Sequence, residues 1–215
     1  MEWSIIDTDA EGADGIFFHP AIPAAQPGAI EGQRGMVRLF VAIDLPDEIR
    51  ERMRGPQEHL KKSSARLNQV DPALIHMTLK FIGEVREDAV AAIASALSTL
   101  TFSPYDLRIT GVGANSPRQP RVIWCEIADG GGSARLHAMV EDALLPLGIP
   151  RDDRPFRPHA TLARVKQSDP SLPGWIRSIP PGDLGSCTVD AFRLKKSTLT
   201  PCGPVYETLL EVPAS

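Results

Sequence analysis

One four-residue pattern occurs twice in this chain and limits the ways in which the chain can fold. The pattern H-x-T-L appears at residues 76–79 and again at residues 159–162, and both copies stand in segments with the composition of β-strands. Side chains two residues apart in a strand point to the same face. Each copy is therefore predicted to direct its histidine and threonine to one face and its apolar residues to the other. Two such strands side by side would gather two imidazoles and two hydroxyls around a space about the size of a phosphate group.

This set of side chains suits acid–base chemistry on a phosphodiester. Opening a cyclic phosphodiester requires that water lose a proton on one side and that the leaving oxygen gain one on the other, and histidine performs both tasks near neutral pH. The hydroxyls of Thr78 and Thr161 can donate hydrogen bonds to the non-bridging oxygens and stabilise the charge that develops there. A single histidine in a strand is more often a packed residue than a catalyst, but the repetition reverses this expectation for His76 and His159.

The other histidines do not extend the pattern. His19 lies in the N-terminal segment, and His59 and His137 are predicted on solvated faces of helices. A metal site is not expected, because His76 and His159 have no histidine, cysteine or carboxylate partner at ligand spacing. We therefore expect a reaction that needs neither a metal nor another cofactor.

Composition argues against several classes of protein. The chain has 215 residues, 42% of them hydrophobic, and a net charge of −4. It is predicted to form one globular domain or two small lobes that share a core. We expect no membrane helix and no secretory signal, because the apolar runs are short and the N-terminus lacks a basic stretch. Three cysteines without a C-x-x-C pair argue against disulfides and favour the cytoplasm. We expect a monomer in which any RNA binds at a local basic site.

Residues 1–35 differ from the remainder of the chain. They contain three prolines, several glycines and scattered acidic residues without an amphipathic period, and are predicted to form a disordered extension. Met36 directly precedes the first clear strand and is therefore a candidate start of translation. The alternative is that the extension packs through residues 16–18. We accordingly divide the chain into an extension, 1–35, and a domain, 36–215.

The domain shows signals for both helices and strands. Amphipathic periodicity and terminal residues predict three helices, at 47–62, 86–100 and 133–145, the last ended by Gly148. Apolar runs predict strands at 37–43, 66–70, 75–82, 107–112, 121–127, 159–165, 188–199 and 205–212. A proline- and glycine-rich loop is predicted at 168–185. Because strands and helices do not alternate strictly, their order indicates an α+β architecture.

With these features the sequence resembles the two-histidine (2H) phosphoesterase superfamily, and within it the RNA 2′,3′-cyclic phosphodiesterases formerly called 2′-5′ RNA ligases. The resemblance covers about residues 36–211, with the elements in the same order, and excludes the extension. It rests on residues 38–46, 76–85, 154–164 and 194–206. Met77 stands where leucine is commoner and Ala160 where a larger apolar residue is usual. Both are predicted to point away from the cleft, so neither affects the expected chemistry.

The resemblance implies a two-lobed α+β fold with a pseudo-twofold axis, in which antiparallel sheets line a central cleft and helices lie outside. It also implies hydrolysis of a terminal 2′,3′-cyclic phosphate on RNA, tRNA fragments among the candidates, to a 2′-phosphate without a metal ion. By the same resemblance His76 donates a proton to the leaving 3′ oxygen, and His159 accepts a proton from the attacking water.

Further residues are candidates for substrate binding. Similar proteins carry an arginine at the position of Arg164 that contacts the phosphate, although a surface arginine is the alternative. Phe81 or Phe40 is predicted to stack on the terminal base, with core packing as the alternative for a phenylalanine in a strand. Five arginines are also predicted to form a rim that guides RNA, or else to be solvated: Arg118, Arg121, Arg151, Arg154 and Arg157.

Two other functions are compatible with the same residues. In one, the pocket joins RNA ends through a 2′-5′ bond, the reverse reaction, or acts on another cyclic phosphate or a 2′-5′ oligonucleotide. In the other, the protein binds RNA ends without catalysis. The non-catalytic function is less expected, because binding alone does not require two groups for acid–base catalysis.

Overall fold

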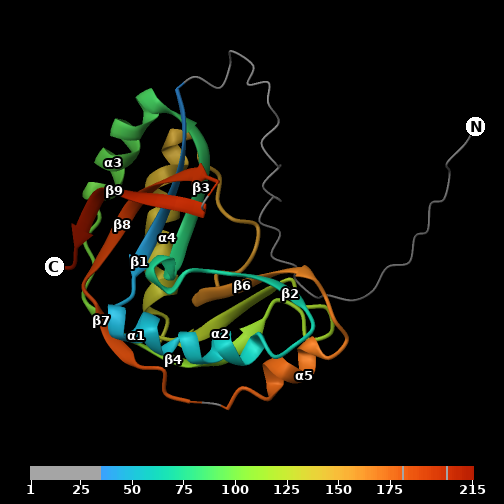
Figure 1. The fold of residues 1–215 in the computed structure, drawn as a ribbon. Coiled ribbons are helices and arrows are strands. Elements are labelled where there is room, and N and C mark those ends of the chain that lie inside the picture. The colour runs from blue at the N-terminus through green and yellow to red at the C-terminus, as the bar shows by residue number, and fades with distance from the viewer. Residues whose placement is uncertain (1–34, 181, 202) are drawn as a thin grey trace, which may run out of the picture.

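The fold is built around one curled antiparallel sheet with helices on its outer side (Figure 1). The computed structural model describes residues 35–180, 182–201 and 203–215 of the chain. None of the helices in these ranges combines the length and the hydrophobicity that a membrane-spanning segment requires. The predicted extension, with His19 and residues 16–18, lies outside the described residues apart from Gly35.

The sheet consists of two halves, which meet at the two H-x-T-L strands. The half that we call the His76 lobe has the strand order β3 (His76–Arg86), β1 (Met36–Asp44), β8 (Ala191–Thr200) and β9 (Gly203–Pro213). The half that we call the His159 lobe has the order β6 (His159–Gln167), β5 (Val122–Ala128), β4 (Tyr105–Ala114) and β7 (Ser186–Val189). The short strand β2 (Arg66–Gln69) also pairs with β6. Each lobe therefore begins with its motif strand and continues through three further strands, as a pseudo-twofold axis between β3 and β6 requires.

The helices cover the sheet in a crossed arrangement. Helices α3 (Val90–Ser98) and α4 (Gly132–Leu144) pack on the His76 lobe, whereas α1 (Asp47–Arg52), α2 (Arg54–Leu60) and α5 (Leu172–Arg177) lie on the His159 lobe (Figure 1). Short 3-10 turns are η2 (Pro72–Leu74), η3 (Glu87–Ala89) and η4 (Leu145–Leu147). Thus α1 and α2 follow β1 but cover the opposite lobe, and α4 follows β5 but covers the His76 lobe. This exchange ties the two lobes together.

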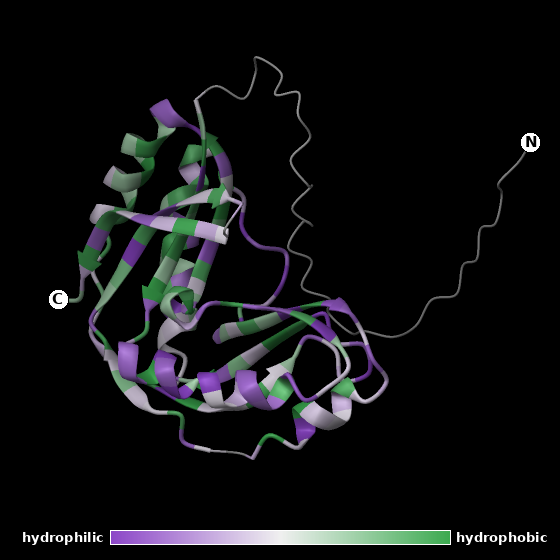
Figure 2. Ribbon diagram, in the orientation of Figure 1, coloured by the Kyte–Doolittle hydropathy of each residue, from purple (hydrophilic) through white to green (hydrophobic). Residues whose placement is uncertain are grey.

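Burial of apolar side chains holds the helices against the sheet. Figure 2 shows hydrophobic residues along the strands and hydrophilic residues over much of helices α1 and α2. The main core runs through both lobes, and a smaller core in the His159 lobe consists of Leu60, Ile123, Leu172 and Ile176. The apolar residues of both H-x-T-L motifs are buried, as their alternation predicts: Met77, Leu79, Ala160 and Leu162.

The predicted two-lobed α+β fold is confirmed, although its two antiparallel sheets are halves of one sheet. Two predicted helices have different limits. The helix predicted at 47–62 is divided at Met53 into α1 and α2. The helix predicted at 86–100 begins later, because β3 continues to Arg86, where it still finds a ladder partner in Met36. Only after the turn η3 does the helix α3 begin, at Val90.

Two further predictions were wrong. The segment 168–185, predicted as a loop, contains helix α5, because Leu172 and Ile176 lie four residues apart and bury one face of a short helix. Pro173 is tolerated there because it stands in the first turn. The single strand predicted at 188–199 is two strands separated at Asp190: β7 pairs with β4 in the His159 lobe, and β8 pairs with β1 in the His76 lobe.

Candidate active site

The two H-x-T-L strands lie next to each other and are joined at one ladder position. Strands β3 and β6 run antiparallel and pair at Met77 and Ala160. One residue to either side of this pair, the histidine of each motif stands opposite the threonine of the other, on the face away from the core. Diagonal positions in such a pair are roughly 7–8 Å apart. The two imidazoles therefore flank a space that a phosphate group can occupy, as the spacing of the motifs predicts.

Both imidazoles are held by the same backbone contact. Nδ1 of His76 lies 2.8 Å from the carbonyl oxygen of Leu74, and Nδ1 of His159 lies 2.7 Å from that of Arg157. A carbonyl oxygen can only accept a hydrogen bond, so each Nδ1 carries a proton and donates it. The other ring nitrogen, Nε2, is then a proton acceptor in the neutral ring and a proton donor in the charged ring. Each histidine is thus prepared for either role in acid–base catalysis.

The surroundings of both histidines disfavour their charged forms. Burial lowers the pKa of His76, and the positive charges of Lys195 and His159 lower it further, against the opposing effects of the Leu74 carbonyl and Asp44. Burial also lowers the pKa of His159, and the charge of Arg164 adds to this effect. Positive groups surround both rings and disfavour their protonation. The negative charge of a bound anion would have the opposite effect and favour protonation of one imidazole.

Aromatic side chains support each imidazole. The ring of Phe40 lies 5.0 Å from that of His76, and Tyr206 approaches the same imidazole edge-on at 5.4 Å. On the other side of the cleft, the ring of Trp124 lies 4.9 Å from that of His159. Phe40 is only 3% exposed. Its ring therefore packs beneath His76, the core alternative for this residue, and stacking on a base stays a prediction for Phe81.

A β-bulge follows the threonine of each motif. In the first motif Ala42 faces Thr78 and the next residue of β1, Val41, faces Lys80, so Leu79 is an extra residue in β3. In the second motif Trp124 and Ile123 of β5 face residues 161 and 163, so residue 162 is extra in β6. An extra residue shifts the alternation of side chains by one. Two successive residues are accordingly buried in each motif, at 79–80 and at 162–163.

The bulges turn the fifth residue after each motif histidine into the cleft. With simple alternation Phe81 and Arg164 would point to the core, on the side of Met77. The shift places them instead on the same face as the histidines, where Phe81 is 45% exposed and Arg164 is half-buried. Two of the three residues predicted to bind the substrate, Phe81 and Arg164, therefore occupy equivalent positions in the two lobes.

Two residues from different lobes influence each other electrostatically across the cleft. The pKa of Arg164 on β6 is lowered by burial and raised by Tyr206 on β9, and the pKa of Tyr206 is raised by burial and lowered by Arg164. Each group is therefore close enough to influence the charge of the other. Tyr206, which also touches His76, connects the arginine with the opposite imidazole.

Sequence reasoning missed four residues of this site. Tyr206 and Trp124 contact the imidazoles, and Lys195 lies beside His76, where its Nζ is 2.7 Å from the carboxylate of Asp44. Asp44 is opposite His76 in the ladder between β1 and β3. Pairing of distant strands brings these residues together, so no local pattern points to them. For Asp44, Lys195 and Tyr206 the resemblance offered the one available signal, since it includes residues 38–46 and 194–206.

The prediction of a solvated His137 was wrong. His137 is 7% exposed, and its Nδ1 lies 2.8 Å from the carbonyl oxygen of Leu79. His59 is partly buried, with Nε2 2.9 Å from the hydroxyl of Ser178. Helix α4 packs against the His76 lobe and α2 against α5, so neither histidine has a fully solvated face.

One group of potential metal ligands is present in the described ranges, and none of its members belongs to the two motifs. It consists of His137, Glu141 and Asp152. The ammonium group of Lys80 lies among them, 2.7 Å from Glu141 and 2.6 Å from Asp152. It also donates to the carbonyl oxygen of Pro150 at 2.9 Å. The position between the two carboxylates is therefore already occupied by a buried lysine.

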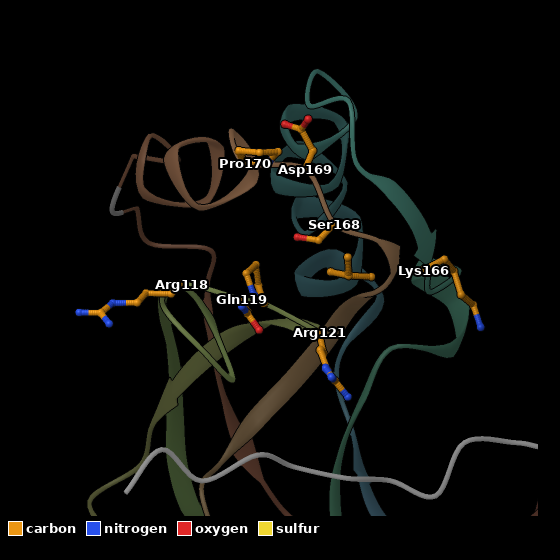
Figure 3. A pocket seen from close by; sticks show the side chains of 9 residues that line it. Arg118, Gln119, Arg121, Lys166, Ser168, Asp169 and Pro170 are labelled. Atoms are coloured by element: carbon orange, nitrogen blue, oxygen red, sulfur yellow. The ribbon is translucent and has the colours of Figure 1, made fainter. Parts of the chain in front are cut away.

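The arginines predicted to form a rim lie in separate places. Arg118 and Arg121 line a pocket of about 680 Å³ at the end of the His159 lobe, with Lys166 and Asp169 (Figure 3). No side chain of either H-x-T-L motif lines this pocket. Because Arg121 is the neighbour of Val165 in the ladder, its side chain belongs to the face opposite to that of the catalytic groups. Guidance of RNA by this pair stays a prediction.

The other three rim arginines precede the second motif. Arg151 pairs with Asp142 on α4. Arg154 and Arg157 are exposed in the segment that leads into β6, and the backbone carbonyl of Arg157 is the acceptor for His159. Of the five rim arginines, these two are therefore nearest in sequence to His159, and their exposed side chains are available to a substrate strand.

Comparison with known proteins identifies the family. Residues 43–124 and 130–206 match the model of the LigT-like phosphoesterases. An RNA 2′,3′-cyclic phosphodiesterase from Archaeoglobus fulgidus is 40% identical over 174 residues, which are 80% of this chain and 98% of the relative. One from Thermotoga maritima is 31% identical over 180 residues, with coverage of 81% and 94%.

Solved structures show the same fold. The structure of E. coli LigT complexed with 3′-AMP has a TM-score of 0.71 and 29% identity, and the match covers 84% of this chain and 99% of that one. A protein from Thermus thermophilus has a TM-score of 0.68 and 31% identity, with coverage of 82% and 97%. Sequence, fold and paired motifs agree, and the chain belongs to the family of LigT-like, two-histidine phosphoesterases.

Proposed function

We propose that this protein hydrolyses the 2′,3′-cyclic phosphate at the end of an RNA strand, leaving a 2′-phosphate and a 3′-hydroxyl. The observation that carries the proposal is the register of β3 and β6, which sets two Nδ1-anchored imidazoles and two threonines around one space. The curated relatives reported above bear the name RNA 2′,3′-cyclic phosphodiesterase. Both facts favour the same substrate class.

In the proposed reaction the two histidines exchange protons with opposite sides of the phosphate. Nε2 of neutral His159 accepts a proton from water as the water oxygen bonds to phosphorus. The bond from phosphorus to the 3′ oxygen breaks, and Nε2–H of charged His76 gives its proton to that oxygen. The hydroxyls of Thr78 and Thr161 donate to the non-bridging oxygens, on which negative charge accumulates. At the end His76 is neutral and His159 is charged, and solvent restores both.

The two bulge positions orient the substrate. Arg164 carries a positive charge beside His159, and a guanidinium group there can pair with the phosphate oxygens. Phe81 offers an exposed ring on the side of His76, and an aromatic face can stack on the terminal base. In this proposal the nucleoside lies towards the His76 lobe and the attacking water towards His159, which agrees with the proposed roles of the histidines as donor and acceptor.

The proposed reaction does not use a metal ion. Two imidazoles supply both proton transfers, and the threonines with Arg164 supply the stabilisation of charge that a cation would otherwise give. Both carboxylates near His137 already pair with the ammonium group of Lys80. We therefore expect the reaction to proceed in a chelator.

The remaining assignments are proposals of the same standing. Cys125 and Cys187 are free thiols, which fits a reducing cytoplasm. We expect a monomer, since both motifs are on one chain. Deletion of residues 1–35 should leave activity and thermal stability almost unchanged, and a large fall in the melting temperature would show that the extension packs on the domain.

The test is incubation of a short RNA ending in 2′,3′-cyclic phosphate with the full chain in EDTA, followed by identification of the product. The expected product gains the mass of one water molecule and carries its phosphate on the 2′ oxygen. A His59→Ala variant serves as the matched control, because His59 lies on α2 outside the cleft. A 3′-phosphate product, or turnover that requires added divalent ions, would contradict the proposal.

A further inference from the structure

Two buried helix side chains hold the carbonyl groups of the two bulges. His137 on α4 donates from Nδ1 to the carbonyl oxygen of Leu79, at 2.8 Å. Gln57 on α2 donates from Nε2 to the carbonyl oxygen of Leu162, at 3.0 Å. Leu79 and Leu162 are the extra residues of β3 and β6. The same contact is therefore made twice, by unrelated side chains, at equivalent places in the two lobes.

The environment of these donors makes the contacts consequential. Gln57 is 3% exposed and His137 is 7% exposed, and buried polar groups are expensive to leave without a partner. A bulge interrupts the regular ladder, and its carbonyl group can then accept a hydrogen bond from a donor outside the sheet. The helices that cross from one lobe to the other deliver these donors.

The two contacts differ in their supporting interactions. The carbonyl oxygen of Leu162 also accepts the backbone N–H of Val70 at 2.9 Å, and the amide of Gln57 bridges to the carbonyl oxygen of Val70 at 2.7 Å. His137 instead stacks on Phe156, with ring centroids 4.5 Å apart, in the segment that leads to the second motif. Its Nε2 lies 3.3 Å from the carboxylate of Glu141. His137 therefore touches the first bulge and the approach to His159 together.

We propose that His137 and Gln57 are positioning residues of the active site, which fix the two bulges and through them the placement of Phe81 and Arg164 in the cleft. The side chains do not reach the reacting atoms. They act because a bulge that relaxes to a regular ladder would return Phe81 or Arg164 to the core face. This inference rests on the proposed function, since it assigns the effect to binding of the terminal nucleotide.

The test compares steady-state kinetics of His137→Leu and His137→Asn on the RNA substrate. Leucine removes the donor, and KM is expected to rise about tenfold with a smaller change in kcat, the scale of one hydrogen bond. Asparagine keeps a donor near the position of Nδ1 and should restore most of the loss. Gln57→Leu should act in the same direction but more weakly, because Val70 still donates to that carbonyl oxygen.

A double-mutant cycle separates positioning from a general structural role. In a Phe81→Ala background His137→Leu should no longer raise KM, because the side chain that it positions is absent. Ser133→Ala is the matched control: Ser133 is buried on the same helix and its hydroxyl contacts the hydroxyl of Tyr105 at 2.9 Å. Ser133→Ala should leave KM unchanged relative to each background, the wild type and Phe81→Ala.

Several outcomes would overturn the inference. A wild-type KM in folded His137→Leu would do so, as would an equal rise in KM with and without Phe81. If the leucine variant does not fold, His137→Gln replaces it in the test, because glutamine moves the donor to the position of Nε2. A KM of His137→Gln equal to that of His137→Asn would then refute the positioning role. If the wild type does not turn over cyclic-phosphate RNA, the proposed function fails instead. A crystal structure of the variant then decides the inference, which predicts loss of the 6.3 Å approach between Phe81 and Phe40.

Discussion

The two lobes share their catalytic framework and differ in the residues that surround it. Each lobe supplies a histidine anchored to a carbonyl two residues earlier, a threonine on the same face, and a bulge one residue after that threonine. The residue that the bulge turns into the cleft is Phe81 in the His76 lobe and Arg164 in the His159 lobe. Beside the imidazoles, the His76 lobe has the pair of Asp44 and Lys195.

This difference explains how a nearly symmetric site can act on an asymmetric substrate. The shared framework supplies two equivalent acid–base groups, and symmetry alone cannot tell which one faces the leaving oxygen. A charged residue on one side and an aromatic residue on the other give the phosphate and the base different places. We therefore propose that residues outside the repeated motif set the direction of the reaction.

Loss of either histidine should have the largest effect. His76→Ala and His159→Ala are each expected to lower kcat/KM on cyclic-phosphate RNA by at least about 100-fold, because each removes one proton transfer. The double variant should be little slower than either single one, since the two imidazoles act as a unit. Multiplicative losses in the double variant would show that the lobes act independently.

The threonines should have the next largest effect. Thr78→Ala and Thr161→Ala are expected to slow kcat by about 10- to 1,000-fold, the scale of one lost oxyanion donor, while thermal melting stays close to that of the wild type. Similar losses from both would support the equivalence of the lobes. Rates near that of the wild type in both would mean that the threonines serve only the strand.

Substitution of Phe81 and of Arg164, the two residues that the bulges turn into the cleft, should show that the two lobes bind different parts of the substrate. Arg164→Ala is expected to lower kcat/KM by about 10- to 100-fold and to weaken inhibition by inorganic phosphate, since it removes a charged contact. Phe81→Ala should raise KM by about tenfold and leave phosphate inhibition unchanged, because stacking concerns the base. Equal phosphate inhibition in both variants would contradict this division.

The dependence of the rate on pH is expected to show the smallest but most informative difference between His76 and His159. The lowered pKa of His159 lets it stay neutral somewhat below pH 6.5, so the acidic limb should lie below that value. The lowered pKa of His76 causes the free enzyme to lose its acid early, so the basic limb of kcat/KM should also be shifted to low pH. A bound phosphate anion raises this pKa, and the basic limb of kcat should therefore lie at higher pH. Both limbs report on the coupled pair of imidazoles and not on one histidine alone. Basic limbs of kcat and kcat/KM that coincide would contradict the binding of an anion between the imidazoles.

Local pattern predicted the placement of the motif side chains well, because that placement depends on short spacing. The alternation within each motif and the burial of Met77 and Ala160 follow from strand geometry alone. Alternation without a bulge would place Phe81 and Arg164 on the wrong face. The resemblance brought Arg164 forward, and Phe81 was a candidate only as an aromatic residue that could stack on a base. Neither placement could be derived, because a bulge depends on pairing with a distant strand.

The errors in the fold have the same origin. Helix α5 forms because Leu172 and Ile176 find an apolar partner in α2, and His137 is buried because α4 crosses to the other lobe. Asp190 divides two strands that belong to different halves of the sheet. In each case a contact between distant segments overrides the local signal. No single stretch of the sequence contains that contact.

The central claim is that His76 and His159, equivalent in structure, have opposite roles. The most direct measurement compares their alanine variants on the RNA substrate and on a phosphodiester whose leaving group departs without a proton. On the activated ester His76→Ala should recover much of its rate, because no acid is needed, whereas His159→Ala should stay slow, because water still requires a base. Equal recovery of both variants, or recovery of His159→Ala alone, would contradict the account.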